Sequence, residues 1–143
     1  MMQNRAQVWL VVTVIFFGVT ESHLVDAAPP RVKDGAELYD KCRNDPVYCD
    51  ETFDTYRAVY AIMVIPELRN RPENREIVQG YEDRGTFSGI CLPRDRLFDE
   101  KFAEELSKLF LAWAKPRRES LIGLTSGEAV RQLMQARFPC QSQ

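Results

Sequence analysis

The stretch from Asp99 to Ala114 carries the clearest helical pattern in the chain. Its large apolar side chains recur four, seven, eight and eleven positions after the first, which places them on one face of a helix: Phe102, Leu106, Leu109, Phe110 and Trp113. Asp99 is a suitable N-cap, because a short carboxylate accepts hydrogen bonds from the free amides of the first turn. Pro116 ends the helix, since the residue before a proline avoids the helical region. A stripe with three aromatic residues predicts that this helix lies in the core of a bundle, where further helices cover its apolar face.

Three other segments show the same kind of pattern, and they span residues 34–42, 50–65 and 125–138. Asp34 and Thr125 are each followed three residues later by a glutamate, which is the spacing of a capping box. Pro66 and Pro139 stop the second and third of these segments. The sequence therefore predicts an all-α fold, a small bundle of about four helices.

Residues 66–93 lack this periodicity and are predicted to form one long irregular loop. A loop of this length in a small domain is usually either functional or disordered, and the sequence leaves both readings open. Five of its residues are candidates for contacts with a partner protein: Tyr81, Glu82, Asp83, Arg84 and Phe87. The two aromatic residues are the expected anchors, because aromatic side chains often dominate the energy of an interface. The alternative is that this stretch is only a soluble turn.

Residues 1–27 resemble a secretory signal peptide. Arg5 gives a positive start, and residues 8–19 are almost entirely apolar. Val25 and Ala27 supply small residues at the positions before a cut, so cleavage is expected after Ala27. The alternative is an uncleaved anchor, which is disfavoured because such a run spans only about 18 Å as a helix, less than a bilayer core. The expected mature domain is 28–143.

The charge and the histidine content limit the functions that are possible for that domain. The whole chain has 19 basic and 21 acidic residues. This near balance lacks the excess of positive charge that is typical of proteins that bind nucleic acid. The chain's single histidine, His23, lies in the expected signal peptide. The mature domain therefore lacks Ser-His and Cys-His nucleophile activation and histidine-ligated zinc. We expect no catalytic residue, no metal and no cofactor, and no membrane attachment after cleavage.

The cysteines provide the covalent constraint on the fold: Cys42, Cys49, Cys91 and Cys140. An exported chain enters an oxidising compartment, and an even count there predicts two disulfides. Four cysteines allow three pairings. The predicted helix layout favours Cys42 with Cys49, because the end of one helix meets the start of the next across a short turn. It favours Cys91 with Cys140, because these residues flank adjacent ends of the last two long helices.

The order of these motifs resembles that of a known family. A signal peptide is followed by a first helix that ends in a cysteine and by an aromatic-rich second helix that begins with a cysteine. Two short cysteine–proline motifs come later in the chain: Cys91-Leu92-Pro93 and Phe138-Pro139-Cys140. Over almost the whole mature domain the chain resembles the Rap/Tai family of immunity proteins from type VI secretion systems. The resemblance implies a periplasmic helical protein, often a homodimer. It would bind and block a peptidoglycan amidase effector that neighbouring cells deliver.

Two other classes of function compete with this one. An exported helical carrier of an apolar ligand would use the aromatic helix faces as pocket walls. An enzyme would need paired carboxylates, but neighbours in sequence such as Glu104 and Glu105 splay across a helix and are expected to form a solvated face.

Overall fold

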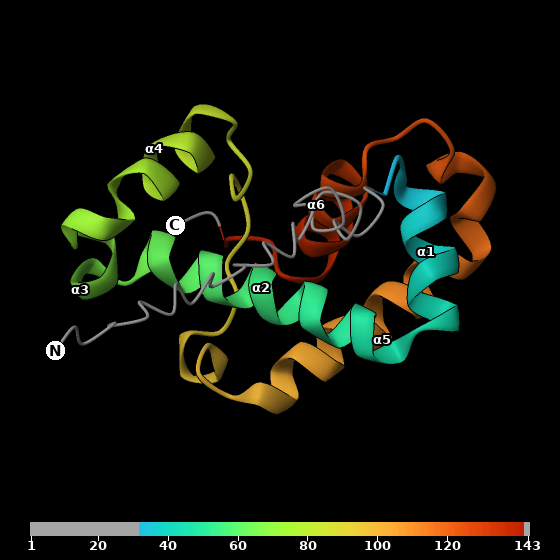
Figure 1. The fold of residues 1–143 in the computed structure, drawn as a ribbon, viewed down its shortest axis with the longest axis horizontal. Helices are drawn as coiled ribbons and strands as arrows, with labels where there is room; N and C mark the ends of the chain where they lie inside the picture. Colours follow the sequence, from blue (N-terminus) through green and yellow to red (C-terminus); the bar gives the residue numbers. More distant parts are fainter. Residues whose placement is uncertain (1–31, 142–143) are drawn as a thin grey trace, which may run out of the picture. The chain divides into compact units, whose positions relative to one another are not determined.

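The computed structural model describes residues 32–141, and these form helices joined by short connections (Figure 1). The α-helices are α1 (Gly35–Asn44), α2 (Pro46–Val64), α3 (Pro66–Arg69), α4 (Arg75–Asp83), α5 (Glu100–Ala114) and α6 (Ser126–Arg137). The 3-10 helices are η2 (Pro72–Asn74), η3 (Arg94–Arg96) and η4 (Lys115–Leu121). Within the described range the only strand-like feature is an isolated antiparallel bridge between Ile90 and Pro139. The predicted all-α class is confirmed, but with six α-helices rather than about four.

The predicted central helix is α5, and it packs along α2 with α1 and η4 also against it. Phe102, Leu106, Phe110 and Trp113 are buried, whereas Leu109 is half-buried. The ring of Phe110 lies 5.5 Å from that of Phe53 on α2, which joins the two helices at the centre of the core. The aromatic stripe therefore serves as the core of the bundle.

The predicted helix starts rest on local cap chemistry. Asp34, Asp99 and Thr125 each accept a hydrogen bond from a backbone amide in the first turn of the helix that follows. The start of α2 was predicted wrongly, because Pro46 was interpreted as part of a chain break before Asp50. Proline fits the first turn of a helix, where its missing amide costs nothing, and the Asp45 side chain caps that turn.

Two disulfides close this bundle, Cys42–Cys49 and Cys91–Cys140, with Cα–Cα distances of 4.6 and 4.9 Å. These are the pairings that the helix layout favoured. The first joins the end of α1 to the start of α2, and the second joins the segment before α5 to the chain after α6. Two disulfides indicate a compartment outside the cytoplasm with an oxidising environment.

The predicted irregular loop over 66–93 is wrong, because most of it is helical. Residues 66–89, which we call the arm, contain α3, η2 and α4 and extend from the end of α2 (Figure 1). Asn74 Nδ2 donates to the Leu68 carbonyl oxygen at 2.7 Å, and Arg69 pairs with Glu82 across the arm. Val78 is its only buried apolar residue among those described. The arm escaped the periodicity test because α3 and η2 have only four and three residues and the apolar face of α4 spans little more than one turn, from Ile77 to Tyr81.

The expected signal peptide and its cleavage site fall outside the described residues. Across residues 32–141, no helix combines the length and apolar character needed to span a bilayer.

Candidate binding groove

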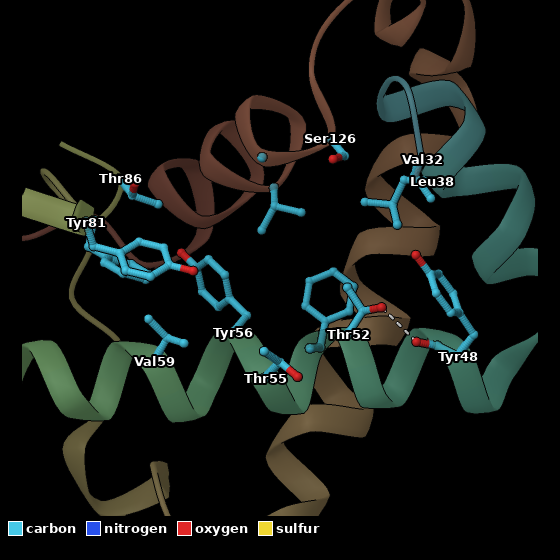
Figure 2. Close-up of a pocket in the computed structure, with 14 residues that line it drawn as sticks. Val32, Leu38, Tyr48, Thr52, Thr55, Tyr56, Val59, Tyr81, Thr86 and Ser126 are labelled. Carbon is cyan, nitrogen blue, oxygen red and sulfur yellow. Dashed lines mark hydrogen bonds between the residues drawn. The ribbon is translucent and has the colours of Figure 1, made fainter. Parts of the chain in front are cut away.

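A groove of about 260 Å³ opens between α2, the end of the arm and the start of α6 (Figure 2). We call it the aromatic groove. Its lining residues are Val32, Leu38, Tyr48, Thr52, Phe53, Thr55, Tyr56, Val59, Tyr81, Thr86, Phe87, Ser126, Gly127 and Val130. None of these side chains is charged, so the groove suits an uncharged, largely apolar occupant.

Helical spacing explains why α2 supplies one wall. Four lining residues follow Tyr48 at offsets of four, seven, eight and eleven positions, which places all five on one face of the helix: Thr52, Thr55, Tyr56 and Val59. Figure 2 shows the side chains of Tyr48, Thr52 and Tyr56 rising from α2 on the same side. That face adjoins the one that packs on α5, so a single helix serves both the core and the groove.

Phe87 closes the end of the groove nearest the arm. Its ring centroid lies 5.2 Å from that of Tyr56, 5.4 Å from that of Tyr60 and 5.5 Å from that of Tyr81. Tyr60 fixes the chain that returns from the arm, because its hydroxyl donates to the Ile90 carbonyl oxygen and accepts from the Leu92 amide, each at 3.1 Å. The aromatic cluster therefore ties the arm to α2.

Among the described residues that line the groove, the Tyr56 hydroxyl is the one buried side-chain polar group without a hydrogen-bond partner. Figure 2 shows the Tyr56 ring directed toward the side of the groove where Tyr81 lies. Burial, with a smaller effect of Tyr60, raises the pKa of the Tyr56 hydroxyl well above its usual range, so the group stays neutral.

The five predicted partner-binding residues divide into two groups. Tyr81 and Phe87 both line the groove, and the Arg84 guanidinium lies over the Tyr81 ring, 4.6 Å from its centroid. Glu82 does not line the groove and pairs with Arg69, while Asp83 accepts a hydrogen bond of 2.7 Å from Gln79 Nε2. The structure thus brings together Tyr81, Arg84 and Phe87 and assigns local structural contacts to the other two.

Sequence reasoning missed most of the groove. The helical pattern predicted over 50–65 includes Tyr56 and Val59 in its apolar stripe, but both are only half-buried and line the groove instead. Ser126, Gly127 and Val130 join them from α6, which no local pattern could bring next to α2. The available signal was the neighbouring face of α2, where Tyr48, Thr52 and Thr55 also fall. Trp113, expected as a wall by the carrier interpretation, is not among the lining residues.

Glu104 and Glu105 lie in different surroundings. Arg96 holds Glu105 in a hydrogen-bonded ion pair, at 2.8 Å between Nη2 and Oε1, and this lowers the pKa of that carboxyl. Glu104 is exposed and lines a separate hollow between α2 and α5. Among residues 32–141, no group of three or more acidic, cysteine or histidine side chains is placed to hold a metal ion.

Comparisons with protein-family models, with curated proteins and with solved structures found no match to this chain.

Proposed function

We propose that this chain is a periplasmic immunity protein, exported by the signal peptide at residues 1–27, that binds and inhibits a type VI secretion peptidoglycan amidase effector. The observation that carries the proposal is the exposed end of the arm, where Tyr81 and Arg84 stack beside the aromatic groove. Aromatic and arginine side chains are the residues that most often anchor protein interfaces. The family resemblance of the cysteine and proline motifs supplies the identity of the partner.

The fold suits a protein that acts by binding a partner in the oxidising periplasm. Two disulfides hold the ends of the long helices, so the core does not depend on its apolar burial alone. The arm end is presented on this fixed core by the aromatic cluster around Phe87. An ordered surface loses little conformational entropy when a partner docks, which favours tight inhibition.

The test is protection of cells in which the neighbouring effector is directed to the periplasm. Co-expression of the full chain with the product of the gene beside its own should restore growth. The matched control is the same chain without residues 1–27, which should stay in the cytoplasm and give no protection. If the full chain protects against no adjacent effector, the immunity proposal fails. Light scattering of the purified complex would also show whether the chain binds as the homodimer that the resemblance implies.

A further inference from the structure

The two disulfides differ in their exposure to solvent. Cys42 and Cys49 belong to the core, with 0% and 1% of their surface exposed. Cys91 and Cys140 are both exposed. Because thiol–disulfide exchange begins with the attack of a thiolate on a sulfur atom, access to the bond decides whether the reaction occurs in the folded protein.

The path of the chain explains why the second bond lies at the surface. Ile90 and Leu92 are each only 3% exposed, and Cys91 stands between them. Such alternation is typical of extended chain, where neighbouring side chains point to opposite sides. Ile90 also forms the antiparallel bridge with Pro139, which places Cys140 beside Cys91. Burial of the two apolar neighbours therefore turns the bond outward.

Backbone contacts hold the two exposed cysteines together independently of the bond. The Cys91 amide donates to the Phe138 carbonyl oxygen at 2.8 Å, and the Cys140 amide donates to the Gly89 carbonyl oxygen at 3.1 Å. These hydrogen bonds do not require the sulfur atoms to be joined. The two residues would stay adjacent as thiols, so the bond can open and close again in the folded bundle.

We infer that Cys91–Cys140 is a site of reversible thiol–disulfide exchange with a dithiol reductant, and that Cys42–Cys49 is closed to this reaction in the folded protein. One thiolate of the dithiol attacks a sulfur of the exposed pair, forms a mixed disulfide and releases the other cysteine as a thiolate. The second thiol of the reductant then displaces the remaining cysteine. The reductant leaves as a disulfide, and its two electrons and two protons reside on Cys91 and Cys140.

The exchange has a defined structural consequence. It removes the covalent tie between the chain that returns from the arm and the chain after α6, while α1 stays joined to α2. The inference does not rest on the proposed immunity function, because it uses only the exposure of the bonds and the contacts around them.

Reduction of the native protein by dithiothreitol tests the inference. Samples are taken over time, alkylated with iodoacetamide, and mapped by mass spectrometry of their peptides. Cys91 and Cys140 should be labelled at least about tenfold faster than Cys42 and Cys49, since an opening that costs about 1.4 kcal/mol already slows attack on a buried bond tenfold. Glutathione disulfide, added after the reductant is removed, should restore Cys91–Cys140.

The matched control is the same reaction in urea, where burial no longer protects either bond and most of the difference in rate should disappear. The inference is overturned if Cys42–Cys49 opens as fast as Cys91–Cys140 in the native protein. It is also overturned if the same difference persists in urea, or if the opened pair does not close again. Protection against the effector is measured separately, so either proposal can fail while the other stands.

Discussion

The helical core and the arm are stabilised by different kinds of interaction. The core buries apolar side chains from α1, α2, α5, η4 and α6 around Phe110 and Leu106 and is closed by two disulfides. The arm buries only Val78 among its described residues, and it is held by the half-buried Phe87 ring against Tyr56 and Tyr60 and by polar contacts such as the pair between Arg69 and Glu82. Both side chains of that pair are more than a third exposed, and surface ion pairs of this kind contribute little to stability.

This difference implies that the core determines the stability of the domain, while the arm is free to serve in binding. Apolar burial and disulfides set the free energy of unfolding, so substitutions in the core should destabilise the whole domain. The arm can change its exposed side chains at little cost, which is expected of a surface that must match a partner. The predictions below test this division.

The largest contrast is expected between a core ring and an exposed arm residue. Phe110→Ala should lower the free energy of unfolding by about 3–5 kcal/mol, because it removes a fully buried ring that contacts Phe53. Ile77→Ala on α4 should stay within about 0.5 kcal/mol of the wild type, since that side chain is 38% exposed. Urea unfolding at constant temperature measures both. Equal effects would remove the distinction between core and arm.

The two disulfides should differ in their contribution. Loop-closure entropy assigns roughly 4 kcal/mol to Cys91–Cys140, which spans 49 residues, and roughly 2.5 kcal/mol to Cys42–Cys49, which spans 7. Thermal unfolding of the Cys91→Ser/Cys140→Ser variant should therefore begin well below that of Cys42→Ser/Cys49→Ser. The reverse order would show that native-state packing, rather than loop length, decides the contribution of each disulfide.

Close packing of α1 on α6 gives a smaller effect. A Cβ atom at Gly35 would lie 2.7 Å from the Ala129 Cβ, so Gly35→Ala should cost about 1–3 kcal/mol. The matched control is Gly127→Ala, where a Cβ meets no atom within 4 Å and the change should be neutral or slightly stabilising. A Gly35→Ala variant as stable as wild type would mean that the two helices can move apart freely.

Acid should weaken the domain through Asp40. A hydrogen bond from Arg118 lowers the pKa of Asp40 in the folded state. The stabilisation is therefore complete above the unfolded pKa of about 4 and is lost as the pH falls through the folded value. Asp40→Asn should flatten the fall in melting temperature below pH 4 by a small amount, because the pair is partly exposed. An unchanged acid profile in this variant would exclude the pair as a source of acid sensitivity.

Local chemistry explains which parts of the fold could be predicted from the sequence. The caps at Asp34, Asp99 and Thr125 and the stripe of α5 depend on residues within one or two turns, so each could be identified directly. The disulfide pairs followed from the helix ends. The arm could not be identified, because α3 and α4 are short and α4 buries only Val78.

The groove depended on information that the sequence does not contain. Tyr81 and Phe87 were identified as candidate anchors because they are aromatic residues in a polar segment. The opposite wall requires Val130 and Gly127 of α6 to approach Tyr56 of α2, and only the folded arrangement determines that approach. The unpaired Tyr56 hydroxyl is likewise a property of its surroundings rather than of its position in the chain.

The most direct test of the account is the affinity of arm and core variants for the neighbouring effector. Tyr81→Ala/Arg84→Ala removes the stacked pair at the arm end, and Glu104→Ala/Lys108→Ala removes two exposed side chains from α5. Isothermal titration calorimetry should show at least about tenfold weaker binding for the arm variant, a loss of about 1.4 kcal/mol, and binding within about twofold of wild type for the α5 variant. Wild-type affinity in the arm variant, together with weakened binding in the α5 variant, would contradict the claim that the arm carries the binding surface.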